Sequence, residues 1–284
     1  MVLVGCGFAV ATVATRLPLR GRYLFNWDAL QFALGIQRFD LAAHRPHPPG
    51  YIGYIYLGRL LTHLTGATIE SVLTAVSIAG EAATVVGLYL VARRLFGEFA
   101  GLAAALLLLS SPLYWMYGET ALTYGLEPGL ALLGFWLLYR ASRQAGRGLV
   151  LAAGVIGLEG AIRESSEVFL LPALAAVAML ALRRGGQASR RTVALAAAAV
   201  LGATALWALP LLALSGGLPA YLRDSAELGE RVTASSAIWR AGLGGLNLDA
   251  SAVLNGLMMS LVVFLPLALA AGLLRLAEGR AMRP

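Results

Sequence analysis

Acidic, imidazole and guanidinium side chains gather in one short stretch of an otherwise apolar chain. The stretch centres on RPHPPGY, residues 45–51, and its polar members are Asp28, Asp40, His44, Arg45 and His47. Histidine can donate a hydrogen bond to phosphate or sugar, or bind a metal, and arginine can bind phosphate or carboxylate through two parallel hydrogen bonds. These residue types favour a binding site. The alternative is that Pro-Pro-Gly only ends one element and begins the next, which would leave His47 a surface histidine.

Asp28 lies in LFNWDALQFALGI, where the spacing predicts a short amphipathic helix on the surface. Ala29, Phe32, Ala33 and Ile36 share one face of that helix. Asp28 would lie in its first turn, where the helix dipole favours an acid. The position therefore has two interpretations: an acid that only stabilises the helix end, or an acid that acts with the other polar residues of its loop.

Two further places combine charge with apolar surroundings. Glu119, in YWMYGETALTYG, follows aromatic residues that are typical of a membrane interface, and it could be a second carboxylate facing the Asp28 loop. Arg163 and Glu164, in GAIRESSEVFLLP, interrupt an apolar run. Charges inside such a run are costly and usually face a cavity or a partner, which makes this pair a candidate binding site. The alternative is a simple turn in which Glu164 pairs with Arg163.

The chain that must position these residues has the composition of a membrane protein. Of its 284 residues, 59% are hydrophobic and 13% are charged, whereas an ordinary soluble domain is roughly one quarter charged. Apolar runs of this length predict an all-α, polytopic membrane protein with about eight spanning helices. We expect the spans at about 2–18, 71–92, 98–117, 120–139, 148–162, 166–182, 192–214 and 251–274.

Arginine clusters indicate how these spans are oriented. If the tyrosine-rich segment 50–66 lies at the interface without crossing, four clusters fall on one side, which the positive-inside rule makes cytoplasmic. The clusters are Arg93-Arg94, Arg140/Arg143/Arg147, Arg183-Arg184/Arg190-Arg191 and Arg275/Arg280/Arg283. The first extracytoplasmic loop is then 19–70, with juxtamembrane helices, and the second is 215–250. Five arginines run against this arrangement and need a role on the outer side: Arg16, Arg20, Arg22, Arg38 and Arg45.

Other partners and chemistries are disfavoured. The net charge of +7 comes from arginines scattered between apolar runs, without lysine, so we expect no nucleic-acid partner and no Schiff-base chemistry. The single Cys6 allows no internal disulfide. No recognised spacing of metal ligands is present; we assign no metal site, and a requirement for Mg or Mn stays open. We treat 1–284 as a single transmembrane domain that begins inside its first helix or is a fragment.

The sequence resembles the N-terminal half of GT-C fold glycosyltransferases over roughly residues 10–185. The stretches that carry the resemblance are FNWDALQFALGIQRFDLAAHRPHPPGYIGYIYLGRLL and VARRLFGEFAGLAAALLLLSSPLYWMYGET, and HPPGY is most similar to the protein O-mannosyltransferase-like branch. The resemblance implies a first outer loop with two juxtamembrane helices, a catalytic base at Asp28 and a second acid at Glu119. The chain departs from the family in having Trp27-Asp28-Ala29 where an acidic pair is usual, and in lacking a loop lysine.

By this resemblance we expect an inverting glycosyltransferase that moves a sugar from a polyprenyl-phosphate donor to a hydroxyl acceptor on protein, lipid or glycan. Asp28 would take the proton from the acceptor. Arg163, with His47, Arg45 and Glu164, would hold the substrate and its phosphate. The expected location is the inner membrane of a bacterium, with the site at the extracytoplasmic face. Two alternatives stay open: a transporter or flippase, and a non-catalytic GT-C-like scaffold.

Overall fold

The computed structural model describes residues 2–143 and 146–281, with the side chains of 260–261 and 263–281 left out. Within these residues every regular element is helical, and the only β-bridge is an isolated one between Asp40 and Arg45. The prediction of an all-α fold is confirmed. The elements are α1 Val2–Arg16, α2 Trp27–Gln37, α3 Ile52–Thr65, α4 Ile69–Phe96, α5 Glu98–Ser110, α6 Pro112–Gly118, the 3-10 helix η1 Thr123–Gly125, α7 Glu127–Arg143, α8 Arg147–Glu159, α9 Glu164–Arg183, α10 Gln187–Leu214, α11 Leu218–Ser236 and α12 Ile238–Ala281.

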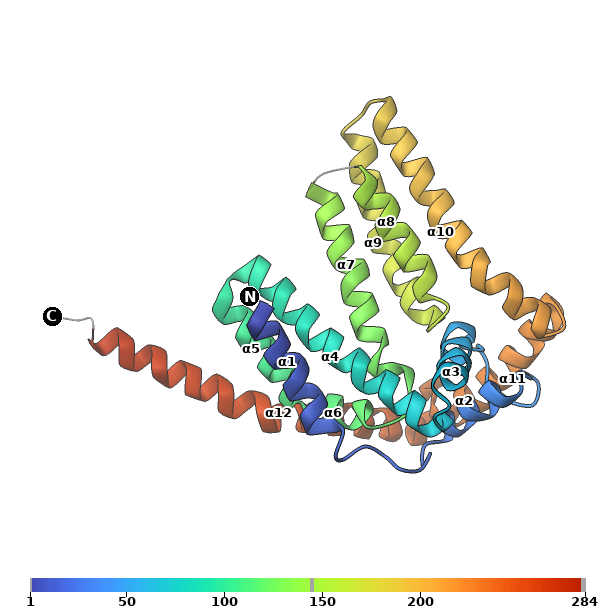
Figure 1. Ribbon diagram of the computed structural model, residues 1–284, viewed down its shortest axis with the longest axis horizontal. Helices are drawn as coiled ribbons and strands as arrows, with labels where there is room; N and C mark the ends of the chain where they lie inside the picture. Colours follow the sequence, from blue (N-terminus) through green and yellow to red (C-terminus); the bar gives the residue numbers. More distant parts are fainter. Residues whose placement is uncertain (1, 144–145, 282–284) are drawn as a thin grey trace.

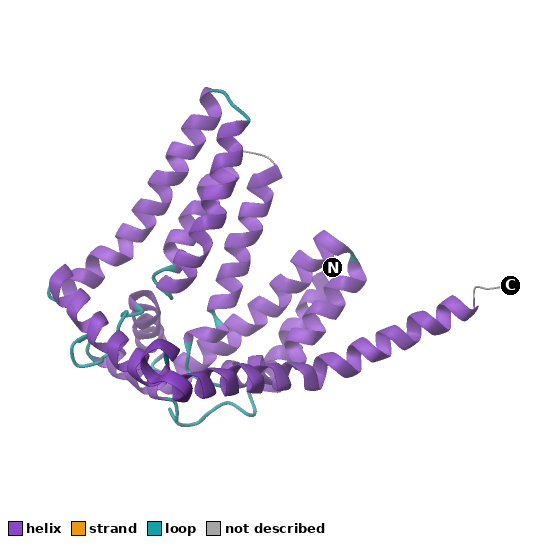
Figure 2. Cartoon of the chain, turned by 180° about the vertical axis from the view of Figure 1, so that it is seen from behind, coloured by secondary structure: helices purple, strands orange, loops and turns teal. Residues whose placement is uncertain are grey.

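The helices form two groups that rise from a common floor (Figure 1). One group contains α1, α4 and α5, and its core includes Phe8, Val85 and Tyr89. The other contains α7 to α10, with a core that includes Leu149 and Ile156. The short elements α2, α3, α6 and η1 make the floor with α11 and the start of α12, as the view from behind also shows (Figure 2). The candidate site residues of the first loop lie on this floor.

Among the residues that the structure describes, three helices are long and apolar enough to cross a membrane: α4, α9 and α10. A fourth span results if α5 and α6 count as one, although they bend by 64° at Ser111, which caps α6 just before Pro112. The expected span 98–117 is therefore broken into two helices, because proline favours the first turn of a new helix. Whether the pair forms one span stays a prediction. The helices α1, α7 and α8 lie where spans were expected but have 15, 17 and 13 residues. The count of eight spans stays a prediction.

The segment 215–250 was expected to be a long loop, and it is instead helical, forming α11 and the start of α12. Its sequence alternates charged and apolar residues at helical spacing, which supports a helix lying on a surface. The side chains of most of the expected span 251–274 lie outside the described residues.

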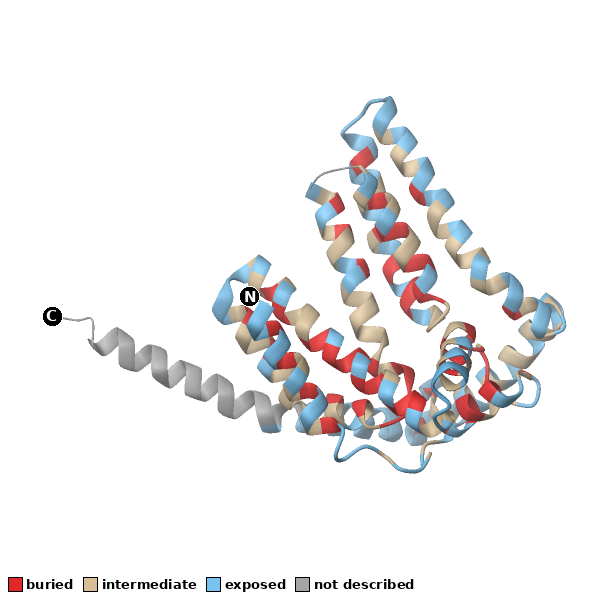
Figure 3. Cartoon of the chain, viewed as in Figure 1, coloured by how far each residue is buried: buried red, intermediate tan, exposed pale blue. Residues whose placement is uncertain are grey.

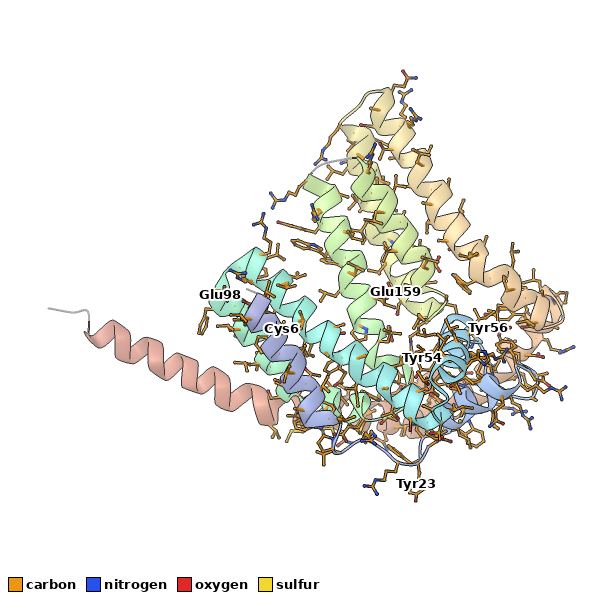
Figure 4. All side chains as sticks on the ribbon, in the orientation of Figure 1. Cys6, Tyr23, Tyr54, Tyr56, Glu98 and Glu159 are labelled. Carbon is orange, nitrogen blue, oxygen red and sulfur yellow. The ribbon has the colours of Figure 1, made fainter. Side chains whose placement is uncertain are left out.

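The connections fall at two opposite ends of the helices (Figure 1). The floor holds 17–68, the turn after α6 and the turn between α8 and α9, while the α4–α5 and α9–α10 connections, the end of α7 and the start of α8 lie at the far end. Figure 4 accordingly shows Tyr23 on the floor side and Glu98 at the far end. Exposed residues follow the outer faces of α9 and α10 (Figure 3), and many of them are large and apolar, such as Phe169 and Leu201. These faces suit contact with lipid, and the protein is a membrane protein.

A buried ion pair fixes α1 against α4 and gives Arg16 a structural role. Both side chains are 0% exposed, and Arg16 Nε donates to Glu81 Oε2 at 2.9 Å. Arg16 Nη2 donates to the Leu109 carbonyl at 2.7 Å, and its guanidinium lies 4.5 Å from the Trp115 ring centre. Gly118 allows this packing, because a Cβ there would lie 2.1 Å from the Glu81 carboxylate. Arg16 thus pairs with Glu81 inside the helix bundle. It is one of the five arginines that ran against the predicted topology, and its buried structural role explains why it lies on the outer side.

Breaking this pair should destabilise the fold. We expect Glu81→Gln to lower the free energy of unfolding by about 3–5 kcal/mol, because the Arg16 charge would stay buried without its counterion. Unfolding in detergent micelles measures this. The matched control is Arg231→Met, which breaks the exposed pair with Glu227 on α11 and should cost at most about 0.5 kcal/mol. Equal losses in the two variants would contradict the structural role.

Candidate functional site

The helix that carries Asp28 begins as its sequence predicts. Asn26 caps α2, and its side-chain oxygen accepts hydrogen bonds from the backbone N–H groups of Asp28, at 2.9 Å, and Ala29. The predicted apolar face is buried: Ala29, Phe32, Ala33 and Ile36 pack into the floor. Asp28 itself keeps a side chain that is 39% exposed. The Asn26 side chain already accepts hydrogen bonds from backbone N–H groups of the first turn, so the Asp28 carboxylate is not needed to cap the helix.

The HPPG turn brings His47 to the same helix. His47 Nε2 lies 3.9 Å from Asp28 Oδ1, and its side chain is 11% exposed. The imidazole ring packs between Phe32, at 5.5 Å between ring centres, and Tyr51, at 5.0 Å. The turn interpretation is confirmed, and the turn buries the histidine beside the acid. The binding interpretation stays a prediction. His47 is not a surface histidine.

Arg163 reaches this region through the turn between α8 and α9. Its backbone N–H donates to the Glu159 carbonyl at 2.9 Å, which closes the end of α8. The first turn of α3 packs directly on this connection, because the Gly53 N–H donates to the Ala161 carbonyl at 2.7 Å. A Cβ at Gly53 would lie 2.7 Å from the Ala161 side chain. The glycine in YIGY thus permits the contact that joins the first loop to the Arg163 turn.

The Arg163 guanidinium is held by several partners. Its Nε donates to Ser165 Oγ at 3.1 Å and lies 3.4 Å from Glu127 Oε2. Its Nη1 donates to Thr123 Oγ1 at 3.3 Å, and the group lies 4.6 Å from the Tyr124 ring centre. An arginine fixed on several sides presents its charge in one orientation, which suits recognition of a planar or tetrahedral anion.

The ion-pair partner of Arg163 differs from the one considered from sequence. We allowed for a turn in which Glu164 pairs with Arg163, and the structure pairs Arg163 with Glu127 instead. Glu164 begins α9, and its two carboxylate oxygens are buried without a hydrogen-bond partner among the described residues. Its charge acts on the hydroxyls of Tyr51 and Tyr221. Glu164 therefore faces the first loop and α11 as an unpaired acid.

The electrostatics link the two parts of the site. Burial lowers the pKa of the His47 imidazole more than the Asp28 carboxylate raises it, and the positive charges of His44 and Arg163 lower it further. Burial also raises the pKa of the Tyr51 hydroxyl, although Arg163 opposes this. At neutral pH His47 and Tyr51 are therefore uncharged. Neutral His47 lies beside the Asp28 carboxylate, and the Tyr51 ring packs against His47.

The other predicted residues lie apart from this group. Trp115 Nε1 donates to the Glu119 carboxylate, which faces the buried Glu81. Glu119 meets the first loop through its backbone carbonyl, which accepts from Gly21 N–H at 3.2 Å. Its role as a second acid stays a prediction. Arg45 is exposed, and its hydrogen bonds to described residues are backbone ones within the turn that Asp40 closes.

Four contributors were not identified from sequence: the ring of Tyr51, the hydroxyl of Thr123, the ring of Tyr124 and the contact at Gly53. Each depends on packing between segments distant in the chain. The small residue within YIGY and the acid Glu127 at the start of an apolar run are the signals that could have pointed to them.

The comparison with known families identifies the family of the chain. The family described as dolichyl-phosphate-mannose-protein mannosyltransferase matches residues 46–209, which is more than half of the chain. The chain belongs to this family. The matched region contains His47, Glu119 and Arg163, and Asp28 precedes it. The resemblance drawn from the sequence is therefore confirmed at the level of the family.

Curated proteins and solved structures give less information about this member of the mannosyltransferase family. Among curated proteins, none matches the chain. Among solved structures, the chain is similar to the oligosaccharyltransferase of Archaeoglobus fulgidus, crystallised in the apo form, with 19% identity and a TM-score of 0.49. The similarity covers 100% of this chain and 39% of that one, so the chain spans well under half of its length.

Metal binding finds no support in the side chains that the structure describes. Within them, no group of three or more His, Cys, Asp or Glu residues could hold a metal ion. The Asp28–His47 pair offers two such groups and Arg163 contributes a charge that would repel a cation.

Proposed function

We propose that this chain is a glycosyltransferase that moves a sugar from a polyprenyl-phosphate donor to a hydroxyl acceptor at the extracytoplasmic face of a membrane. The observation that carries the proposal is the contact of the first loop, which holds the Asp28–His47 pair, with the turn that ends at Arg163, through the hydrogen bond from Gly53 to Ala161. Membership of the mannosyltransferase family supports the same reaction class. The family name gives dolichyl phosphate mannose as the first donor to test.

The chemistry follows from these residues. Asp28 accepts the proton of the acceptor hydroxyl as the hydroxyl oxygen attacks the anomeric carbon. The bond between that carbon and the phosphate oxygen breaks, and its electron pair leaves with the polyprenyl phosphate. Arg163 stabilises the charge that grows on this phosphate. Neutral His47, with its Nε2 towards Asp28, positions the carboxylate. A single displacement inverts the anomeric configuration.

The phosphate needs more positive charge than Arg163 alone provides, because Glu127 already pairs with Arg163. Arg45 is the second positive group we assign, since its side chain is exposed and has no hydrogen bond or ion pair with another described residue. Glu164, whose carboxylate lacks a described partner, is the group we assign to sugar hydroxyls. Arg45 and Glu164 are assigned these roles because the charged group of each has no hydrogen-bond or ion-pair partner among the described residues.

An apolar groove leads away from this site into the membrane-spanning region. It lies between α4 and α7, has a volume of about 410 Å³ and is lined almost entirely by apolar groups, including Ala83, Gly87, Leu126 and Trp136. Leu126 directly precedes Glu127, the partner of Arg163. A polyprenyl phosphate bound at Arg163 could therefore lay its isoprenoid tail in this groove. The position of Leu126, in the groove lining and next to Glu127 in the chain, supports a lipid-linked donor over a soluble one.

Filling the groove should weaken donor binding. We expect Ala83→Phe to raise the KM for a long-chain polyprenyl-phosphate donor roughly tenfold, about 1.4 kcal/mol, with little change for a donor analogue with a short tail. Ala83 is exposed and lines the groove, so the fold should tolerate the ring. Ala79→Phe, one turn earlier on α4 and also exposed but outside the lining, is the matched control. A KM that rises equally in both variants, or equally for both donors, would contradict this path.

The function itself is tested with the chain in proteoliposomes. Radiolabelled polyprenyl phosphate mannose is supplied with hydroxyl acceptors of three classes: serine and threonine peptides, a lipid and a glycan. Transfer, with release of polyprenyl phosphate and inversion at the anomeric carbon, is the expected result. Movement of the intact donor across the bilayer without cleavage would indicate a flippase instead, and neither event would indicate a scaffold.

A further inference from the structure

A second groove lies at the opposite end of the bundle, away from the proposed catalytic site. It runs between the last turns of α7 and the first turns of α8 and has a volume of about 440 Å³. Its lining combines two arginines with two leucines: Leu137, Arg140, Arg147 and Leu151. Nothing in the transfer chemistry uses these residues.

The two guanidiniums in this groove are unpaired. Arg140 and Arg147 are both exposed, and neither has a hydrogen bond or ion pair with another described residue. The neighbouring Arg143, in contrast, donates to the Tyr139 hydroxyl at 3.1 Å and lies 5.3 Å from its ring centre. The sequence from 128 to 158 contains no acid that could neutralise the pair. The groove therefore presents two positive charges to a single small volume.

The rest of the lining is apolar and opens towards the lipid-facing surface. Leu151 is 57% exposed, and Leu133 and Phe135, which precede the groove on α7, are 44% and 55% exposed. A free phosphate would make no use of these side chains. A molecule with an anionic head and an apolar body would contact both kinds of surface, and the groove lies where α7 ends and α8 begins. Anionic headgroups bind basic pockets at such helix ends.

We propose that the α7–α8 groove binds one anionic phospholipid, with the headgroup phosphate between Arg140 and Arg147 and an acyl chain against Leu137 and Leu151. Arginine binds a phosphodiester through charge and paired hydrogen bonds. Basic pockets between spanning helices on the cytoplasmic side are suited to such headgroups. The proposal is independent of the transferase activity, because the groove and the Asp28 site lie at opposite ends of the helices.

Native mass spectrometry of the detergent-purified chain, titrated with phosphatidylglycerol, tests the proposal. We expect one tight adduct, weakened about fivefold by Arg140→Gln or Arg147→Gln and about thirtyfold by both, from the usual contribution of each basic residue. Phosphatidylcholine should bind at the level of the double variant. Arg143→Gln is the matched control, since Arg143 lies beside the groove but is held by Tyr139; it should bind as the original chain does.

Three results would overturn the proposal. Equal weakening by Arg143→Gln would indicate a diffuse basic surface, and displacement of the lipid by millimolar inorganic phosphate would indicate a site for a free anion. Unchanged binding in the double variant would remove the two arginines from any site. Thermal unfolding of each variant separates loss of the lipid from loss of the fold, because both positions are exposed and the melting temperature without added lipid should stay the same.

Discussion

Replacing Asp28 with asparagine should lower the rate of sugar transfer by about 10²–10⁴-fold, because the acceptor hydroxyl would lose the group that takes its proton. Asparagine keeps the size of the side chain, and Asn26 keeps the cap of α2 intact. The KM for the polyprenyl-phosphate donor should change little, since the phosphate contacts are assigned to Arg163. Initial rates in proteoliposomes, measured over a range of donor concentrations, separate kcat from KM.

The same loop provides the control for this variant. Asp40 is an acid of the first loop whose carboxylate accepts a hydrogen bond from the Ala43 N–H at 3.2 Å within the turn. Asp40→Asn can keep that bond and should retain the rate within about threefold, since no proton transfer is assigned to it. An Asp28→Asn variant that keeps more than a tenth of the original rate would refute the assignment of the base. Glu119→Gln then becomes the next variant to test.

The part of the site that could be predicted from sequence is the local part. The apolar face of α2 is defined by Ala29, Phe32 and Ile36 at helical spacing, and all three are buried. The acid at the start of that helix and the Pro-Pro-Gly break are also local signals. Because each depends on residues within one or two turns, the sequence carries enough information to place them.

The rest of the site depends on contacts between distant segments. Arg163 could pair with adjacent Glu164 or with any acid brought near by folding, and only the packing of η1 and α7 against α9 selects Glu127. The hydrogen bond from Gly53 to Ala161 likewise requires α3 to lie on the α8–α9 turn. A single sequence shows that such residues are costly to bury, but it does not show which partner offsets the cost.

Arg16 shows that the membrane topology, too, depends on a partner that the sequence alone does not reveal. By sequence it lies at the edge of the first outer loop, where it counts against the positive-inside rule. In the structure it is fully buried against Glu81 and contributes to helix packing instead of to the charge of the loop. The short lengths of α1, α7 and α8 are a second case. Apolar residues continue after the end of α1, before the start of α7 and after the end of α8, which hides where each helix begins or ends.

Removing the Arg163 charge should be the second most damaging change, with Arg163→Gln lowering kcat/KM by about 10²–10³-fold, as expected for the loss of a group that stabilises charge on the leaving phosphate. This variant alone would not separate chemistry from stability. It leaves the half-buried Glu127 carboxylate without its counterion, and among the described residues only the Ser166 hydroxyl still donates to it. A fall in the melting temperature is therefore expected as well.

The double variant Arg163→Gln/Glu127→Gln distinguishes the two causes. It removes both charges of the pair, so the melting temperature should recover towards that of the original chain. Transfer should not recover, because the phosphate still lacks its fixed guanidinium. The transfer rate of Arg163→Lys should lie between the rates of the original chain and of Arg163→Gln, since lysine keeps the charge but not the two parallel hydrogen bonds. If the double variant regained transfer to within tenfold of the original rate, Arg163 would be a structural partner of Glu127, and the leaving phosphate would have to be stabilised by another group.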